Sequence, residues 1–167
     1  MLVDNYIINI KSPRETISNT RPLIPSLGDK WYNTDVYRWY TYNADINAWV
    51  SEEKLSLIYS KELGVDGSNL YIGTSRSNTT GYLIGNDAII VSITGRADSG
   101  ANPKSFDLKI DGVSLYSFTM IDYKYYKDTT LDNLTILQGK TITCFCVSSG
   151  SFIVNPIINI IIAWVIF

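Results

Sequence analysis

The chain has 167 residues with no histidine, two cysteines and a formal net charge of −2 at neutral pH. Without an imidazole there is no Ser-His or Cys-His nucleophile pair and no histidine-containing zinc site, so most hydrolase templates are excluded. A pI near 5.0 gives no overall basic field, so no nucleic-acid partner is expected, although a local basic patch stays open.

Composition favours strands throughout. Hydrophobic residues make up 46% of the chain, which is enough to bury a full core. Twenty-three isoleucines, with thirteen asparagines and seventeen serines, favour strands and turns, because β-branched side chains lose rotamer freedom in helices. We therefore expect an all-β protein. The first ten residues lack the basic start and apolar run of a secretory signal.

Residues 1–27 are expected to form an extended N-terminal anchoring arm. Pro13, Pro22 and Pro25 interrupt its short apolar runs. Proline removes a backbone donor and biases the preceding residue toward extended geometry, which suits a segment lying along another surface. The residues expected to make the anchoring contacts are Ile7, Ile8, Ile10, Pro22, Leu23, Ile24 and Pro25.

Residues 28–51 predict a small aromatic β-meander. Its strands are expected at Trp31–Tyr32, at Tyr37–Tyr42 and around Trp49–Val50, with a turn at residues 33–35 and a loop at residues 43–47. Alternation along the second strand places aromatic rings on both faces. The rings are either the core of a small module or a platform for a sugar or a partner protein. They are Trp31, Tyr32, Trp39, Tyr40, Tyr42 and Trp49.

Residues 52–80 are interpreted as a linker followed by the first strands of the main domain. The stretch from Ser51 to Leu63 is compatible with a helix capped by Ser51, or with a charged linker that enters a strand. We prefer the linker and strand. The glycines at positions 64, 67 and 73 mark successive turns after it.

Residues 81–167 predict an antiparallel sandwich or jelly roll. A strand over 88–95 is expected to direct Ile89, Val91 and Ile93 to one face, and a strand over 105–110 to direct Phe106, Leu108 and Ile110 inward. Asp111-Gly112 is a hairpin turn. Further strands are expected over 113–120, 131–137, 141–147 and 152–154, and Pro156 precedes the final strand.

No pattern in the sequence carries catalysis, a metal or a cofactor, and we expect none of the three. Candidate acid pairs such as Asp107 with Asp111 lie at turns and have no spacing suited to glycosidic cleavage. No phosphate-binding or calcium-binding loop is present in the sequence. Cys144 and Cys146 share one strand face, so they are expected to be free core thiols.

The closing segment, residues 157–167, is almost wholly apolar, and its eleven residues are too few for a spanning helix, so we expect a buried strand without membrane insertion. Apolar residues on both faces require cover on both sides. One face would meet the sandwich core and the other neighbouring subunits, unless the segment is a central strand of a monomer. The expected interface residues are Ile158, Ile160, Ile162, Trp164 and Ile166.

Two stretches resemble a known family. The residues that carry the resemblance are Gly81-Tyr82, Lys104-Ser105-Phe106-Asp107-Leu108, Asp111-Gly112-Val113, Leu115, Phe118, Asn155-Pro156-Ile157 and Ala163-Trp164. They resemble the trimeric jelly-roll heads of tailed-phage fibre and capsid-decoration proteins, whose fold is similar to tumour-necrosis-factor domains. The run Gly28-Asp29-Lys30-Trp31-Tyr32-Asn33-Thr34, with Trp49-Val50, is similar to an aromatic module that often precedes such heads.

The resemblance implies a non-enzymatic virion protein on the capsid surface, a cement protein or head fibre. The expected partners are two further copies in a homotrimer and the major capsid protein or another virion protein. The short chain leaves no room for the shaft of a tail fibre, which favours the capsid. The alternative is a receptor- or carbohydrate-binding tip that recognises a host-surface glycan through exposed rings. The rings proposed for it are Trp31, Tyr40, Tyr42, Tyr123, Tyr125 and Tyr126.

Overall fold

The protein is all-β, as predicted. The computed structural model describes residues 12–73, 81–128 and 134–167. Seventeen strands account for the regular structure within these ranges. No helix that could cross a membrane occurs among these residues.

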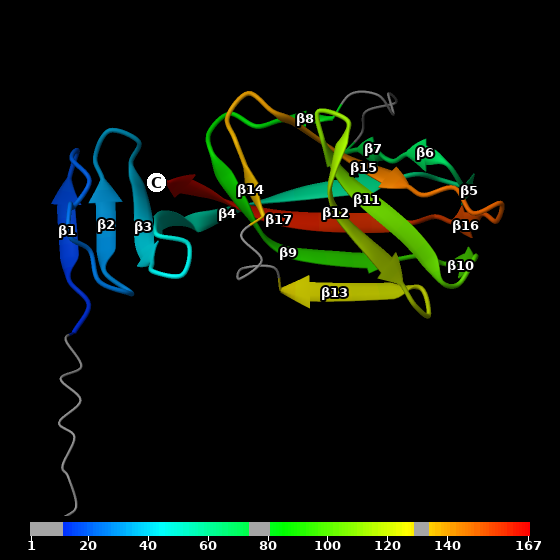
Figure 1. Cartoon of the computed structure of the whole chain (residues 1–167), viewed down its shortest axis with the longest axis horizontal. Coiled ribbons are helices and arrows are strands. Elements are labelled where there is room, and N and C mark those ends of the chain that lie inside the picture. The colour runs from blue at the N-terminus through cyan, green and yellow to red at the C-terminus, as the bar shows by residue number, and fades with distance from the viewer. Residues whose placement is uncertain (1–11, 74–80, 129–133) are drawn as a thin grey trace, which may run out of the picture.

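The strands form three sheets (Figure 1). The large sheet contains β1 (Glu15–Ser18), β2 (Lys30–Asn33), β3 (Arg38–Asn43), β4 (Ala48–Ser60), β7 (Tyr71–Ile72), β9 (Ala88–Arg96), β13 (Lys124–Asp128), β14 (Thr135–Ile136) and β17 (Ile157–Ile166). The second sheet contains β6 (Ser68–Asn69), β8 (Tyr82–Leu83), β11 (Lys104–Ile110), β12 (Val113–Met120) and β15 (Thr141–Cys146). A small sheet contains β5 (Gly64–Val65), β10 (Ser99–Gly100) and β16 (Ile153–Val154).

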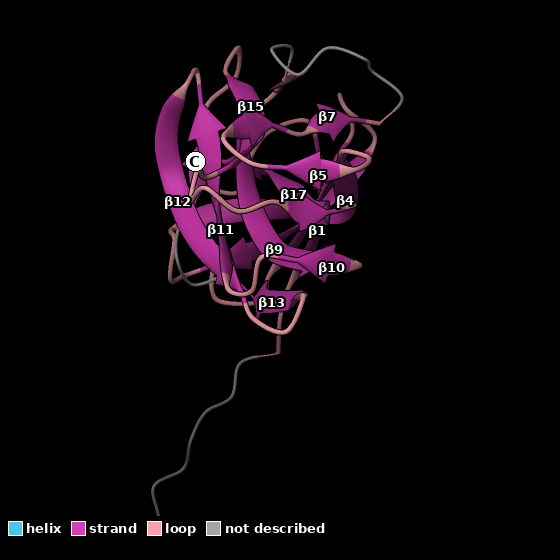
Figure 2. Cartoon of the chain, turned by 90° about the vertical axis from the view of Figure 1, so that its right-hand side faces the viewer, coloured by secondary structure: helices cyan, strands magenta, loops and turns pink. Residues whose placement is uncertain are grey.

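The head of the molecule is a sandwich of the large and second sheets, which Figure 2 shows as separate layers. The core between them draws on both sheets, with Ile160 and Ile93 from one and Phe106 and Leu108 from the other fully buried. The hydroxyl of the buried Tyr59 donates a hydrogen bond of 2.8 Å across the layers to the carbonyl of Ile142. The predicted inward direction of Phe106 and Leu108 is therefore confirmed.

The strand order of the head is regular. β6 and β8 both pair with β15 and are counted here as one element. The eight elements of the head, numbered 1 to 8 in chain order, are then β4, β6/β8, β9, β11, β12, β13, β15 and β17. The large sheet has the order β4-β17-β9-β13, which is 1-8-3-6 in this numbering. The second sheet has β6 and β8 beside β15, then β11 and β12, which is 2-7-4-5.

One long strand joins the meander to the head. β4 pairs with β3 through its first residues and with β17 along most of its length. The predicted boundary after residue 51 lies inside this strand, and the helical interpretation of residues 51–63 is wrong. Leu57 and Tyr59 are buried while Ser56 and Ile58 are exposed, so the segment has the two-residue period of a strand.

β9 contains a β-bulge, and the predicted common face of its residues is therefore wrong. Ile161 and Ile162 of β17 pair with Ser92 and Ile90, so Val91 is an extra residue in β9. A bulge of one residue reverses the direction of every side chain beyond it. Ile93 consequently lies in the sandwich core with Ile90, whereas Ile89 and Val91 lie in a second cluster, and the three predicted residues do not share a face.

The other predicted turns and strands are found with modest changes. Asp111 and Gly112 have φ values of 48° and 84° between β11 and β12, the pair of positive values that a type I′ hairpin requires. The expected strand over 131–137 contains β14 at residues 135–136, while residues 131–133 lie outside the described residues. Pro156 directly precedes β17, as predicted.

A buried ion pair closes the end of the head that is far from the meander. The Lys104 ammonium, on a side chain only 1% exposed, contacts the carboxylate of Asp66 and donates hydrogen bonds of 2.8 Å to Ser149 Oγ and to the Ser151 carbonyl. The hydrogen bond from Lys104, with those from the backbone of Ser149 and Gly150, lowers the pKa of Asp66. Three acceptors therefore satisfy the buried ammonium.

Replacing Lys104 by methionine is expected to lower the urea midpoint, because it removes the cation of Asp66 and leaves the acceptors at Ser149 and Ser151 without their donor. Urea denaturation followed by tryptophan fluorescence measures the change. The matched control is Lys140→Met, which removes a solvent-exposed pair with Asp111 at 2.9 Å. That control should shift the urea midpoint far less, and an equal effect of the two variants would contradict the assignment.

Candidate interaction surfaces

One short segment of the predicted anchoring arm, β1 at Glu15–Ser18, belongs to the meander sheet. β1 pairs in parallel with β2, an arrangement that the sequence analysis did not foresee. Leu23 and Ile24 are 87% and 85% exposed, so they are available for the predicted contact with a partner. Pro22 and Pro25 are half-buried. The other three predicted anchoring residues, Ile7, Ile8 and Ile10, lie outside the described residues.

Asp29 ties this segment to the meander. Its carboxylate accepts hydrogen bonds from the backbone N–H of Arg14 at 2.9 Å and of Ser26 at 3.0 Å. The Arg14 guanidinium adds an ion pair at 2.7 Å. Burial by itself raises the pKa of Asp29, but the hydrogen bonds and the charge of Arg14 outweigh it and lower the pKa to about 2. The folded state therefore favours the ionised carboxylate.

The stabilisation that the ionised Asp29 carboxylate gives to the fold should weaken in acid. Because the folded pKa lies below the ordinary value of 3.8, its stabilisation is complete above that value and is lost as the pH falls toward 2. Asp29→Asn should cost about 2 kcal/mol near neutral pH, and this difference from wild type should shrink as the pH approaches 2. Urea denaturation of both proteins across this range measures it. Asp45→Asn, at an exposed turn, is the control and should change little, and a pH-independent loss in Asp29→Asn would contradict the role of the charge.

The aromatic residues of the meander divide between a core and a surface. Trp31, Tyr40 and Trp49 are 2 to 3% exposed, and their rings pack with centroids 5.5 and 5.6 Å apart. Tyr42 lies against Trp49 at 5.5 Å, and its hydroxyl bonds to the side chain of Asn47 at 2.6 Å. Trp31 and Tyr40 therefore cannot stack on a sugar, and the proposal that they belong to an exposed platform is wrong.

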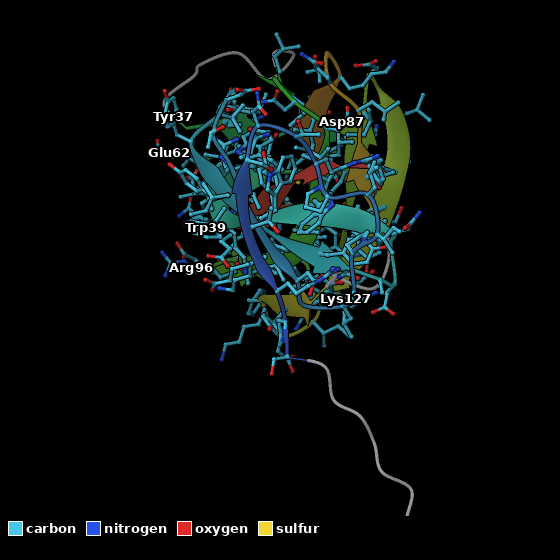
Figure 3. All side chains as sticks on the ribbon, turned by 90° about the vertical axis from the view of Figure 1, so that its left-hand side faces the viewer. Tyr37, Trp39, Glu62, Asp87, Arg96 and Lys127 are labelled. Atoms are coloured by element: carbon cyan, nitrogen blue, oxygen red, sulfur yellow. The ribbon has the colours of Figure 1, made fainter. Side chains whose placement is uncertain are left out.

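The opposite face of the meander carries the remaining rings. Tyr32 and Trp39 pack together with centroids 5.2 Å apart, and both are partly exposed. Tyr37 in the preceding turn is 76% exposed. Figure 3 shows Tyr37 and Trp39 at the periphery of this end of the molecule. Aromatic rings on both faces are thus confirmed, with one face closed as a core.

The predicted subunit-interface residues occupy a different place. Ile158, Ile160 and Ile162 are fully buried in the sandwich core, so their assignment to an interface between subunits is wrong. Trp164 packs against the margin of the same core, and Ile166 against the meander rings. β17 is a central strand between β4 and β9, and its core-facing residues are covered by the chain's own second sheet.

The alternate residues of β17 form a surface that the prediction missed. Ile157, Asn159 and Ile161 point away from the core and are partly exposed. In the row through Asn159, the paired residues are Ile58 of β4, Thr94 of β9 and, beyond it, Tyr126 of β13. Asn159 was the available signal, since a polar residue within an apolar strand marks the face that is not in the core. We call this surface the outer face of the large sheet.

Only part of the outer face is covered by the described chain. Ile46 and Val50, in and after the β3–β4 turn, pack over the cluster that contains Ile89 and Val91, next to Ile161. Beyond this cover Ile58 is 49% exposed and Tyr126 is 74% exposed. The described residues thus leave apolar side chains open to solvent on the remainder of this face.

Two of the three tyrosines in the β12–β13 region were misjudged as exposed rings. The ring of Tyr125 lies 4.5 Å from that of Phe118, and its hydroxyl is 3.1 Å from that of Tyr116. Tyr123 is half-buried, and its hydroxyl donates to the carbonyl of Gly100 at 3.3 Å. Tyr126 alone of the three is largely exposed, on the outer face of the large sheet.

The outer face of the second sheet differs in chemistry. Its pairs are polar: Ser105 bonds to Thr119 at 2.9 Å, and Ser117 donates to Asp107 at 2.6 Å. The Lys109 ammonium lies 3.7 Å from the ring centroid of Phe145 and covers it. This face has the composition of a solvated sheet surface, so the two outer faces of the sandwich are chemically unequal.

The described parts of the chain hold two free thiols and no cluster of metal-ligating side chains. Residues 12–73, 81–128 and 134–167 contain no group of three or more metal-ligating side chains. Cys144 and Cys146 are free and buried, as predicted. Burial raises the pKa of both thiols, that of Cys146 to about 11, so neither is a nucleophile near neutral pH.

Comparison with protein-family descriptions, with curated proteins and with solved structures finds no match to this chain. The geometry is therefore the basis for a functional assignment. It presents two surfaces suited to protein contact. One is the outer face of the large sheet. The other is the set of exposed apolar side chains on the arm and meander, which includes Leu23 and Ile24.

Proposed function

We propose that this chain is a non-enzymatic phage structural protein that decorates or projects from the capsid as a homotrimer. The observation that carries the proposal is the outer face of the large sheet. It exposes Ile58 and Tyr126 at the two ends of a row that runs through Asn159 and Thr94, whereas the outer face of the second sheet is polar. Exposed apolar patches framed by polar residues are typical of protein interfaces.

The strand order supports a jelly-roll head. When a long hairpin of eight elements rolls up, the partners are 1 with 8, 2 with 7, 3 with 6 and 4 with 5, and successive pairs alternate between two sheets. β4 with β17 and β9 with β13 pair in the large sheet, while β15 with β6 and β8, and β11 with β12, pair in the second. Together with the resemblance of residues 81–167 to phage heads, this order favours a virion protein.

The meander end supplies the attachment site for the major capsid protein or another virion protein. Four large apolar side chains, Ile17, Leu23, Ile24 and Leu27, are 69 to 87% exposed there. Figure 1 shows this end projecting from the sandwich, opposite the small sheet. Burial of these side chains across neighbouring capsomers would add interface area and oppose the outward pressure of the packaged contents.

The trimer should depend on the outer face. Light scattering should give a mass of 3 × 18.8 = 56.4 kDa for wild type. Ile58→Lys should shift the protein to monomer, because it places a charge in an apolar contact. Val113→Lys, at a 72% exposed position on the second sheet, is the matched control and should stay trimeric. A monomeric wild type, or a trimeric Ile58→Lys protein, would remove this part of the proposal.

Capsid decoration is tested on particles. Capsids that carry the protein should release their contents at a higher temperature than capsids without it, as followed by a nucleic-acid dye. The double variant Leu23→Ser with Ile24→Ser should fail to bind the capsid while keeping its fold, because it removes exposed apolar area and no core contact. Leu83→Ser, exposed on the head, should bind normally. Equal heat stability with and without bound protein would refute the cement role.

A further inference from the structure

A groove lies where the meander meets the head and holds about 360 Å³. One wall comes from the meander, with Val36 and Arg38, and the facing wall from the loop before β9, with Asn86 and Asp87. Gln138, Trp164 and Phe167 are among the other lining residues. Figure 1 shows the end of β17 directed toward β3 with the beginning of β9 close by.

Among the polar groups of the groove, Asp87 is held in place by backbone hydrogen bonds. Asp87 accepts a hydrogen bond of 2.8 Å from the N–H of Gln138, and its carbonyl accepts one of 2.9 Å from the N–H of Val165. The loop before β9, the turn at Gln138 and the end of β17 are thereby linked. Among the described residues, the side-chain amides of Asn86 and Gln138 bond to no other protein group. Each amide offers both donors and acceptors to a ligand.

The remaining lining is largely apolar, and its one cation is already paired. Val36 and Phe167 are 48% and 49% exposed. The Arg38 guanidinium lies 5.8 Å from the ring centroid of Trp164, and its charge is matched by Glu53 at 2.7 Å. An anionic ligand would meet the Asp87 carboxylate and find no unmatched cation here.

We propose that this groove binds a neutral saccharide. Two amides and a carboxylate suit vicinal hydroxyl groups. An amide can donate to one hydroxyl and accept from its neighbour, and the carboxylate can accept from both. The exposed ring of Phe167 and the methyl groups of Val36 suit the C–H face of a pyranose ring. The volume lies at the lower end of the range of small-molecule sites, which is roughly 300 to 1,000 Å³.

A second hollow in the head provides a comparison. It holds about 400 Å³ on the outer face of the second sheet and is lined by Asn69, Lys109 and Phe145 among others. Its only lining ring, Phe145, is covered by the Lys109 ammonium. It therefore offers polar groups without an open ring face, and we expect no saccharide there.

Titration with saccharides tests the groove. The probes are the methyl glycosides of glucose, galactose, mannose and N-acetylglucosamine, added to the full chain at millimolar concentrations while amide chemical shifts are recorded. At least one should produce saturable shifts at Asn86, Asp87, Gln138 and the Trp164 indole. Asn86→Ala and Gln138→Ala should each weaken this binding by about fivefold to tenfold, the loss of one hydrogen bond.

The control is Asn69→Ala, which removes the corresponding amide from the second hollow and should leave binding unchanged. Absence of saturable shifts with all four glycosides, or equal weakening by Asn69→Ala, would overturn the proposal. Saturable binding of unrelated peptides at these residues in place of the glycosides would overturn it too. The readout requires neither a trimer nor a capsid, so its failure is distinct from failure of the proposed structural role.

Discussion

The pairing of β17 with β4 is the contact on which both halves of the molecule depend. β4 is the only strand of the described chain that pairs with the meander and with the centre of the head. Its partner β17 lies between β4 and β9 and buries Ile158, Ile160 and Ile162 beneath the second sheet. The hydrophobic burial along β17 therefore fixes the position of the meander as well as the sandwich.

Two irregularities let this one sheet serve two cores. Opposite Trp164, β4 carries three residues, two more than β17, and the Ser51 hydroxyl accepts a hydrogen bond of 2.9 Å from the N–H of Trp164. The bulge at Val91 turns Ile89 and Val91 away from the sandwich and toward the turn that carries Ile46. The regular outer face lies on the head side of these irregularities, and the groove lies where the meander joins the head.

The local periodicity of the chain predicted most of the strands. The structure has the expected hairpin turn at Asp111-Gly112, the expected strand start after Pro156 and the expected alternation over 105–110. Turn chemistry and period-two burial act within a few residues, so a short stretch of sequence is enough to predict them. The bulge at Val91 was not predictable in the same way. Its cause is the register between β9 and a strand some seventy residues later, which no short window of sequence contains.

The sequence by itself determined the class of fold, the aromatic meander, the unreactive thiols and the apolar character of the closing strand. Those properties depend on composition and short-range pattern. Tertiary structure decided which face of β17 is core and which is outer, that Trp31 and Tyr40 are enclosed, and that Asn86 and Gln138 share a groove with Arg38. These outcomes depend on sheet register and on the contact of distant segments, where a shift of one residue moves a side chain to the opposite face.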